Sequence, residues 1–481
     1  MTIHDAFLAA ARALLGPRGF TQDADLLDPW LTDWRGRFTG KALGLASPAS
    51  TKEVSALIRL CAEHDIPIVP QGGNSGMSGG ATPDESGTAI LLSLRRMDTM
   101  RAFDADAMQV TCDAGFVLQN LHDFAEDKGL RFPLTLGGKG SATIGGLIST
   151  NAGGTQVLRH GTMRAQVLGL EAVLADGSVL DMLTALKKDN RGFDLKQLLI
   201  GSEGTLGIVT AATLRLVPKI STRKVVWAGL PSLQHARKLL VHCEKAAAEA
   251  LEGFEIVPAH SLAAVLAHFP DMRAPLGQAH PWNALIEFVG VADAEALDKI
   301  VEDLLAHAFD TGLLDDAVIA SSEAQADALW QLRDSIAPAE RALGPAMQHD
   351  ISVPVAKMAD FVETVSPLVE EAFPGTRAIA FGHLGDGNVH FHVLAEVGAE
   401  RGAWEAATGK AVSRFIHDQV TRWGGSISAE HGIGQVKRDE LARLGDPAAI
   451  AVMQAVKKAL DPQGLLNPGK LVPLAESGPT P

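Results

Sequence analysis

Residues 66–80 read IPIVPQGGNSGMSGG, in which a short apolar run passes directly into a loop with five glycines. The apolar run predicts a buried strand, and the glycines allow the backbone after it to approach a ligand closely. Backbone amides in such a loop can converge on an anionic group, and small polar side chains such as Ser75 add donors. Neither GxGxxG at a helix start nor a GK[ST] ending is present, so the loop is not a Rossmann fingerprint or a Walker A loop. The stretch predicts a pyrophosphate cradle of another kind.

Two more stretches repeat this chemistry. Residues 139–164, KGSATIGGLISTNAGGTQVLRHGTMR, and residues 201–210, GSEGTLGIVT, again combine glycines with hydroxyl side chains. A helix over 50–64 with a capping box at Ser50 and Glu53 precedes the first loop, and short apolar strands and a helix near 116–129 lie between the first loop and the second. The pattern favours a long cofactor threaded between two small α+β lobes over three unrelated surface loops.

From about residue 222 the sequence changes character, because glycine becomes less frequent and apolar strands alternate with long helices. Their order, strand, helix, strand, strand, helix, strand, is the ferredoxin-like pattern. Residues 400–460 are then largely helical in pattern. The prediction is an α+β protein with an N-terminal helical segment (1–40), a glycine-loop domain (41–221), an antiparallel domain (222–425) and a C-terminal segment (426–481) that returns to the active site.

Within the second region, residues 381–392 read FGHLGDGNVHFH. Asp386-Gly387 is a dipeptide typical of a two-residue hairpin turn, which would place His383 opposite His390 and His392 on the same face. The other face would be apolar and buried, with Leu384, Val389, Phe391 and Val393. Three imidazoles on one face indicate a metal site, since neutral imidazole is the commonest metal ligand. Glu430 and His431 are candidates for the second half of that site.

Composition excludes several classes of protein. The chain has 57 acidic and 42 basic residues and a formal charge of −15, which argues against nucleic acid or an anionic membrane as the main partner. Its three widely spaced cysteines suggest neither a disulfide framework nor a thiolate metal site. The sequence shows no secretory signal and no apolar run of the roughly 18 residues that a membrane span needs, so we expect a cytoplasmic protein. Tyrosine is absent, which excludes a phenol as catalytic acid.

Six motifs of this sequence resemble those of a known family and occur in the same order as in that family. They are PQGGNSGMSGG, TIGGLISTNAGG, GSEGTLGIVT, GHLGDGNVHFH, SAEHGIGQVK and LLNPGK. The first three resemble the flavin-binding half of vanillyl-alcohol oxidase type flavoproteins. Residues 40–471 as a whole are similar to the D-2-hydroxyacid dehydrogenases of that superfamily, which include enzymes for D-2-hydroxyglutarate, D-lactate and glycolate. The resemblance implies a two-lobed FAD-binding domain followed by a substrate domain.

The resemblance also implies a set of FAD contacts. A histidine in the first loop would indicate covalent flavin, and Asn74 stands at about that place, so noncovalent FAD is expected. The implied contacts are Gly72, Gly73, Asn74, Ser75, Gly76, Met77, Ser78, Pro133, Gly140, Ser141, Ala142, Thr143, Gly145, Gly146, Thr150, Gly153, Ile208 and Asn467.

For the chemistry, the resemblance implies a divalent metal, most often zinc, on His383, His390 and Glu430. His431 corresponds to the general base, and Arg333 corresponds to the arginine that binds the substrate carboxylate. Two imidazoles and one carboxylate leave open coordination positions, as in a catalytic zinc site. The expected reaction is oxidation of a D-2-hydroxyacid to the 2-oxoacid, with hydride transfer to flavin N5. The electrons would pass to electron-transfer flavoprotein or a quinone rather than to a nicotinamide.

Two departures from the hydroxyglutarate enzymes concern the substrate. Gln348 stands where a lysine is common, and His392 stands where an asparagine is common, so both are candidate substrate contacts. His392 is equally a candidate third imidazole on the metal. D-2-hydroxyglutarate is the first substrate we expect, and D-lactate or another short D-2-hydroxyacid is the alternative. The other two classes are a zinc hydrolase with purely structural glycine loops and a nonenzymatic flavoprotein or scaffold that has lost turnover. A homodimer is compatible with the family.

Overall fold

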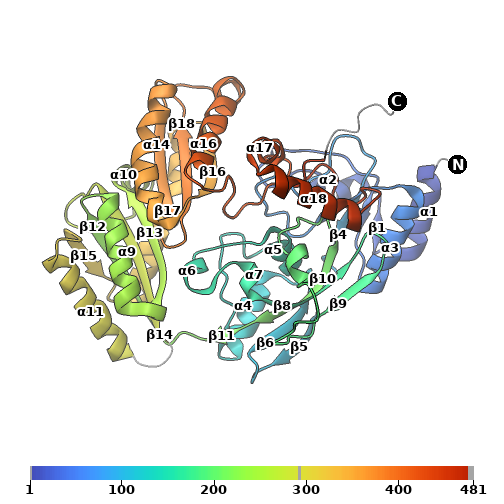
Figure 1. Ribbon diagram of the computed structural model, residues 1–481, viewed down its shortest axis with the longest axis horizontal. Coiled ribbons are helices and arrows are strands. Elements are labelled where there is room, and N and C mark those ends of the chain that lie inside the picture. Colours follow the sequence, from blue (N-terminus) through green and yellow to red (C-terminus); the bar gives the residue numbers. More distant parts are fainter. Residues whose placement is uncertain (1–2, 291–293, 475–481) are drawn as a thin grey trace. The chain divides into compact units, whose positions relative to one another are not determined.

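The computed structural model describes residues 3–290 and 294–474 (Figure 1). The chain divides into two compact units, and it passes between them more than once. Unit 1 comprises Met1–Gly154, His160–Pro218 and Glu430–Pro481, and unit 2 comprises Thr155–Arg159 and Lys219–Ala429. The first main crossing, after Pro218, therefore lies a few residues before the predicted boundary at 221, and the second, after Ala429, lies a few residues after the predicted boundary at 425. The short excursion of Thr155–Arg159 into unit 2 has no counterpart in the prediction.

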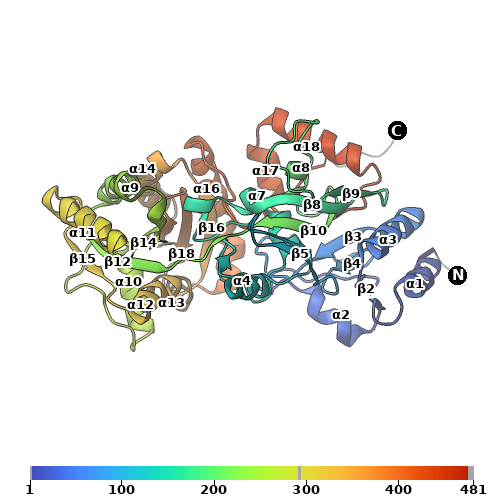
Figure 2. The same ribbon diagram turned by 90° about the horizontal axis from the view of Figure 1, so that it is seen from below.

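Unit 1 is built on two main sheets, with strand orders β1-β2-β4-β3 and β5-β6-β10-β8-β9 (Figure 2). A two-stranded sheet pairs β11 with β7. The strands are β1 (Phe20–Thr21), β2 (Leu45–Ala46), β3 (Ile68–Gln71), β4 (Ile90–Ser93), β5 (Met100–Asp104), β6 (Gln109–Asp113), β7 (Leu130–Arg131), β8 (Val167–Val173), β9 (Val179–Met182), β10 (Ile208–Arg215) and β11 (Val217–Pro218). The helices are α1 (Ile3–Leu15), α2 (Ala24–Leu31), α3 (Thr51–His64), α4 (Leu118–Asp127), α5 (Ile144–Thr150), α6 (Val157–His160, which crosses between the units), α7 (Met163–Gln166), α8 (Lys196–Leu199), α17 (Arg438–Leu444) and α18 (Pro447–Leu460).

Helix α3 begins where the capping-box sequence predicts. The Ser50 hydroxyl accepts a hydrogen bond from the Glu53 amide, as the capping box predicts, and Asp65 ends the helix in a left-handed conformation. The apolar face of α3 is buried against the β1-β2-β4-β3 sheet. Strands β8 and β9 form a hairpin in which pairing stops at Val173 and Val179 and leaves a five-residue loop that contains Asp176 and Gly177.

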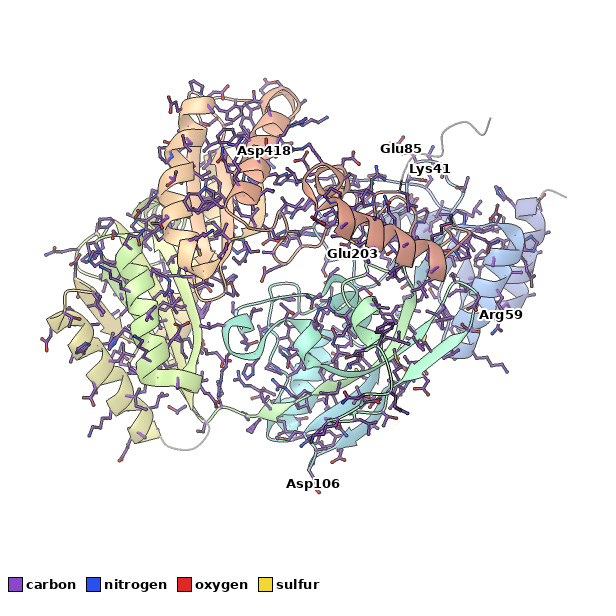
Figure 3. The ribbon with its side chains drawn as sticks, in the orientation of Figure 1. Lys41, Arg59, Glu85, Asp106, Glu203 and Asp418 are labelled. Atoms are coloured by element: carbon purple, nitrogen blue, oxygen red, sulfur yellow. The ribbon has the colours of Figure 1, made fainter. Side chains whose placement is uncertain are left out.

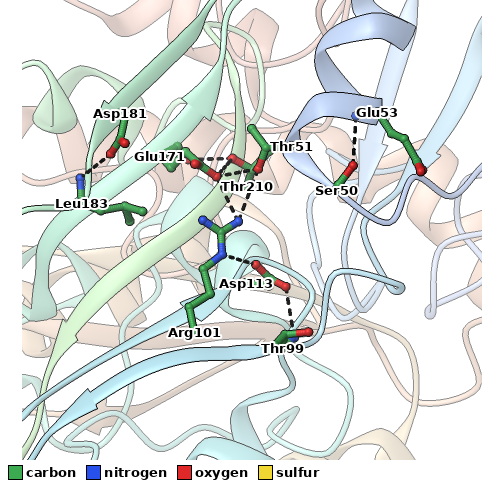
Figure 4. Close-up of polar contacts among 10 residues, drawn as sticks. All are labelled: Ser50, Thr51, Glu53, Thr99, Arg101, Asp113, Glu171, Asp181, Leu183 and Thr210. Atoms are coloured by element: carbon green, nitrogen blue, oxygen red, sulfur yellow. Dashed lines mark hydrogen bonds and ion pairs between the residues drawn. The ribbon is translucent and has the colours of Figure 1, made fainter.

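A polar network joins α3 to the five-stranded sheet (Figure 4). The Arg101 guanidinium binds the carboxylates of Asp113 at 2.6 Å and Glu171 at 3.1 Å. Glu171 also accepts from the hydroxyls of Thr51 and Thr210. Burial opposes ionisation of Glu171, but these donors, with Arg101 first among them, outweigh it and lower its pKa.

We expect Arg101→Met to destabilise unit 1 by roughly 2 kcal/mol, because two largely buried carboxylates lose a charged donor. The thermal midpoint of flavin release, followed by FAD fluorescence, should fall by about 4–8 °C. Because the pKa of Glu171 is lowered in the folded state, its stabilisation is present above the unfolded value of about 4.3 and is lost as the pH falls through the folded value. The difference between the two proteins should therefore shrink in acid. Arg191→Met is the control, since its pair with Asp189 lies on the surface.

Unit 2 is built on one seven-stranded antiparallel sheet of order β15-β12-β14-β13-β17-β18-β16. Its first four strands, with α9 and α11, have the ferredoxin-like order that the sequence predicts. The strands are β12 (Thr222–Leu230), β13 (Leu251–Pro258), β14 (Trp282–Gly290), β15 (Asp316–Ile319), β16 (Ala346–Ser352), β17 (Arg377–His383) and β18 (Asn388–Leu394). The helices are α9 (Leu233–Ala247), α10 (Ala259–His268), α11 (Ala294–Asp310), α12 (Glu323–Asp334), α13 (Ile336–Leu343), α14 (Met358–Ala372), α15 (Arg401–Trp404) and α16 (Lys410–Arg422), with short η1 (Ala248–Ala250), η2 (Val355–Lys357) and η3 (Glu405–Gly409).

The two faces of this sheet are covered by different helices. One face packs on α9, α11, α14 and α16, and the other packs on α10, α12 and α13 (Figure 2). The sheet therefore has two separate cores, and polar side chains on the α12 side lie at the end of one of them.

Across the described ranges, no helix is both long enough and apolar enough to span a membrane.

The β17–β18 hairpin differs from its predicted register. Pairing begins at His383 and Asn388, and Phe381 rather than His383 lies opposite His390. The connection is therefore a four-residue loop in which Gly387 adopts φ +81°, instead of a two-residue turn. Because the shift is two residues, an even number, both histidines remain on one face of the sheet. The apolar face is buried as predicted.

Candidate functional site

A cleft in unit 1 is lined by all three glycine stretches. It encloses about 980 Å³, including its open mouth. Its walls come from the loop after β3, the start of α5 and the loop before β10, together with Ala114 and His431. Thr143 caps α5 by accepting from the Gly146 amide, which points the first turn of that helix at the cleft. Segments that are far apart in sequence thus meet around one cavity.

The glycines of the first loop are required by close backbone packing. A Cβ atom on Gly73 would lie 1.8 Å from the carbonyl oxygen of Ser141, and one on Gly72 would lie 2.5 Å from the hydroxyl of Thr143. Contacts under about 3 Å cannot be accommodated without backbone movement. The cleft is thus a backbone-lined cradle, which suits the pyrophosphate and ribityl parts of FAD.

Twelve of the eighteen predicted FAD contacts line the cleft, and six do not. The lining residues are Gly72, Gly73, Asn74, Ser75, Gly76, Ser78, Ala142, Thr143, Gly145, Gly146, Thr150 and Ile208. The others are Met77, Pro133, Gly140, Ser141, Gly153 and Asn467. Asn467 lies behind the wall, where its side-chain amide donates to the carbonyls of Gly80 and Glu203.

Glu203 lines the cleft and was not among the predicted contacts (labelled in Figure 3). Its carboxylate accepts hydrogen bonds from the amides of Ile433 at 2.7 Å and Gly434 at 2.8 Å. Burial raises the pKa of Glu203, although these amides partly offset the effect. The Ser78 hydroxyl donates to the carbonyl of His431 at 3.0 Å. Two glycine loops therefore hold the EHGIG segment and fix the backbone of His431.

Unit 2 carries the histidines on the α12 side of its sheet. The rings of His383 and His390 lie 5.4 Å apart, and the ring of Phe381 contacts those of His390 and His392 at 5.1 and 5.2 Å. Ring nitrogens of His383 and His390 come within 4.8 Å of one another. A pair of this spacing suits a divalent cation.

Two buried carboxylates, not predicted as site residues, hold two of these histidines. Glu255 bonds Nδ1 of His383, and Glu340 lies 2.7 Å from Nδ1 of His392. The Glu340 carboxylate also accepts from the Ser261 hydroxyl. The sequence contains a signal for Glu255, because this residue interrupts an apolar strand and a carboxylate buried in a central strand requires a charged partner. Glu340 gave no such signal, because it lies in an amphipathic helix.

Arg333, from α12, lies beside this pair. Its Nε and Nη2 atoms both lie 2.8 Å from Oε2 of Glu255, and Nη2 lies 3.4 Å from Nε2 of His383. Burial opposes ionisation of Glu255, but Arg333 and His383 outweigh it and hold its pKa at about 2. Burial, followed by the charges of His383 and Arg333, lowers the pKa of His390 well below its usual value. Gln348 pairs with His392 in the β16–β18 register.

The fold and the cleft together define an FAD-dependent flavoprotein. Comparison of the sequence with known families agrees: the "FAD binding domain" model matches residues 42–183, and the model for the "C-terminal domain" of FAD linked oxidases matches residues 219–471. The second match covers more than half of the chain, and the chain belongs to the FAD-linked oxidase family. The zinc hydrolase alternative loses its premise, since the glycine loops are part of an FAD-binding domain.

Individual similar proteins give a more specific comparison than the family models do. The chain is 38% identical over 471 residues to the mitochondrial D-2-hydroxyglutarate dehydrogenase of Bos taurus, covering 97% of this chain and 83% of the relative. It is 37% identical over 464 residues to D-2-hydroxyglutarate dehydrogenase of Xanthomonas citri pv. viticola, covering 96% of both chains. Among solved structures, p-cresol methylhydroxylase superposes with a TM-score of 0.74 at 15% identity, over 97% of this chain and 96% of that one. The last likeness confirms the expected vanillyl-alcohol oxidase type fold.

Proposed function

We propose that this enzyme oxidises a D-2-hydroxyacid to the 2-oxoacid, with D-2-hydroxyglutarate as the first candidate substrate. The likeness to D-2-hydroxyglutarate dehydrogenases along almost the whole chain carries this assignment. FAD, when held by the glycine loops that line the cleft, would supply the acceptor for the hydride that leaves C2 of the substrate. Electron-transfer flavoprotein or a quinone is the proposed acceptor of the electrons, on the basis of the family resemblance.

His431 is proposed as the base that removes the hydroxyl proton onto an imidazole nitrogen. It is supported by its place in the wall of the flavin cleft and by the bond from Ser78 that fixes its backbone. The substrate loses a hydride from C2 and a proton from its hydroxyl group, in total two electrons and two hydrogens, and becomes the 2-oxoacid. Arg333 is proposed to bind the C1 carboxylate, for which a guanidinium fork is suited.

A divalent metal, when held by His383, His390 and Glu430, would polarise the substrate hydroxyl. The donor set suits zinc, and two imidazole nitrogens within 4.8 Å of one another support it. Glu430 follows Ala429 directly in the chain, and the Ala429 amide donates to the carbonyl of Asp350, which pairs with His390 in the sheet. Chain connectivity thus favours Glu430 as the third ligand.

A short monocarboxylate such as D-lactate is the second candidate, and one observation favours it. A second carboxylate needs positive charge, yet Glu340 offsets any charge on His392, and Gln348 adds none. His392 and Gln348 remain the proposed contacts for the substrate side chain. On this view their region of the sheet suits a small or uncharged group better than a carboxylate.

Anaerobic titration tests both candidates. The oxidised flavin should bleach on addition of the correct D-2-hydroxyacid and stay yellow with its L-isomer, and the ratio of kcat/KM for D-2-hydroxyglutarate and D-lactate decides between the two. Removal of metal with a chelator should leave the flavin bound and slow its reduction, and Zn²⁺ should restore the rate. If no D-2-hydroxyacid bleaches the flavin, the proposed function is wrong.

A further inference from the structure

Glu255 is one of the least exposed ionisable groups of unit 2, with 1% of its surface accessible. It lies in β13, a central strand, next to β17 in the sheet, with Glu255 opposite His383. One carboxylate oxygen bonds the imidazole of His383, and the other bonds the guanidinium of Arg333. A single buried side chain therefore contacts a candidate metal ligand and the candidate carboxylate-binding residue.

The contact with Glu255 fixes the tautomer of His383 when its imidazole is neutral. The carboxylate of Glu255 accepts, so Nδ1 of His383 carries the proton. The lone pair of the neutral ring is then on Nε2, which lies 3.4 Å from Nη2 of Arg333, a group that can only donate. Metals bind imidazole through a lone pair, so a metal on Nε2 would replace this contact with the guanidinium. Glu255 thus selects the tautomer in which Nε2 is the ligand atom.

The same carboxylate holds Arg333. Its oxygen Oε2 lies 2.8 Å from both Nε and Nη2, so one edge of the guanidinium is bound to it. An arginine side chain is otherwise among the costliest to immobilise. Glu255 therefore sets the direction in which the rest of the guanidinium points.

A purely structural ion pair is present nearby for comparison. Glu287 lies on the adjacent strand β14, is largely buried, and pairs with Arg223 at 3.4 Å and with the indole of Trp330 from α12. The described contacts of Glu287 include no histidine. The contact with His383 is thus what separates Glu255 from an ordinary buried ion pair on this sheet.

We propose that Glu255 is a positioning residue that sets both the tautomer of His383 and the orientation of Arg333. This inference rests on the proposed metal site and on the proposed role of Arg333. Metal binding and binding of the substrate carboxylate are then coupled through one side chain. Residues that orient a ligating histidine typically change metal affinity by roughly 10–100-fold when they are replaced.

Three FAD-loaded variants of the full chain test this: Glu255→Gln, Glu255→Asp and the matched control Glu287→Gln. Zn²⁺ affinity is measured without substrate, by competition with a chromophoric chelator, and the thermal midpoint followed by tryptophan fluorescence reports whether unit 2, which contains Glu255, is folded. We expect Glu255→Gln to weaken Zn²⁺ binding by roughly 10–100-fold and to raise KM roughly tenfold. Glu255→Asp keeps the buried charge on a side chain one methylene shorter, and should lose affinity even if the glutamine variant does not fold. Glu287→Gln should match wild type in both measurements.

The possible results are distinct. If wild type fails to bind Zn²⁺, the proposed metal site is wrong and the inference falls with it. If wild type binds Zn²⁺ and both Glu255 variants bind it within about twofold of wild type, the inference alone is overturned. An equal loss of affinity in Glu287→Gln also overturns it, since any buried carboxylate of the sheet would then have the same effect.

Discussion

Replacement of His431 by asparagine should reduce kcat by roughly 10²–10⁴-fold, which is the usual contribution of a positioned general base. FAD should stay bound, because the side chain of His431 is one of many groups around the cleft and its backbone is held through Ser78 and Glu203. Stopped-flow measurement of anaerobic flavin reduction isolates the step concerned. KM should change little, since the proposed base acts on the hydroxyl proton during the reaction.

The control for this substitution is His4→Asn on the exposed surface of α1. Flavin content and thermal midpoint of all three proteins should agree, which would exclude a folding defect. If the rate of flavin reduction in His431→Asn stays within about threefold of wild type, another group removes the proton and His431 is not the base.

Gly73→Ala should abolish stable FAD binding. The added Cβ would lie 1.8 Å from the Ser141 carbonyl, so the loop after β3 must move away from the residues that precede α5. Overpacking of this kind costs about 3 kcal/mol, which corresponds to a roughly 100-fold loss of FAD affinity. The ratio of absorbance at 450 and 280 nm after gel filtration measures the flavin that is retained.

Gly137→Ala is the matched control, because a Cβ on that exposed glycine meets no atom within 4 Å. This variant should retain wild-type flavin. Full flavin retention in Gly73→Ala would mean that the two loops can separate without loss of the cofactor, and that their contact is not what shapes the cleft.

The predictions from the sequence worked where the signal was local. Helix α3 begins after Ser50, where its capping box places it, because a cap is decided by residues within one turn. The register of the hairpin around Asp386 was harder to predict. Its turn is two residues longer at the β17 end than a turn of the Asp-Gly type requires, yet the histidines share a face because the periodicity of a strand survives an even shift.

The contacts of the Glu255 and Glu203 carboxylates could not be predicted from the sequence, for a physical reason. Glu255 meets His383 across 128 positions of sequence, and Glu203 meets Ile433 across 230. Neither pair has a spacing that a helix or a turn could generate, so only the assembled sheets and loops bring them together. Pairings of this kind follow from long-range topology rather than from local preference.

The chain leaves unit 1 after Pro218 and returns to it at Glu430, immediately before His431. Residues 219–429 are thus an insertion between two parts of unit 1. Contacts of Glu203 with Asn467 and with the Ile433 amide join these two parts on either side of the insertion. Evolution can therefore alter the inserted body, with its histidine face, almost independently of the redox machinery. Relatives with the same flavin cradle should diverge most within the insertion, and new substrates can be acquired there without rebuilding the electron-transfer half of the enzyme.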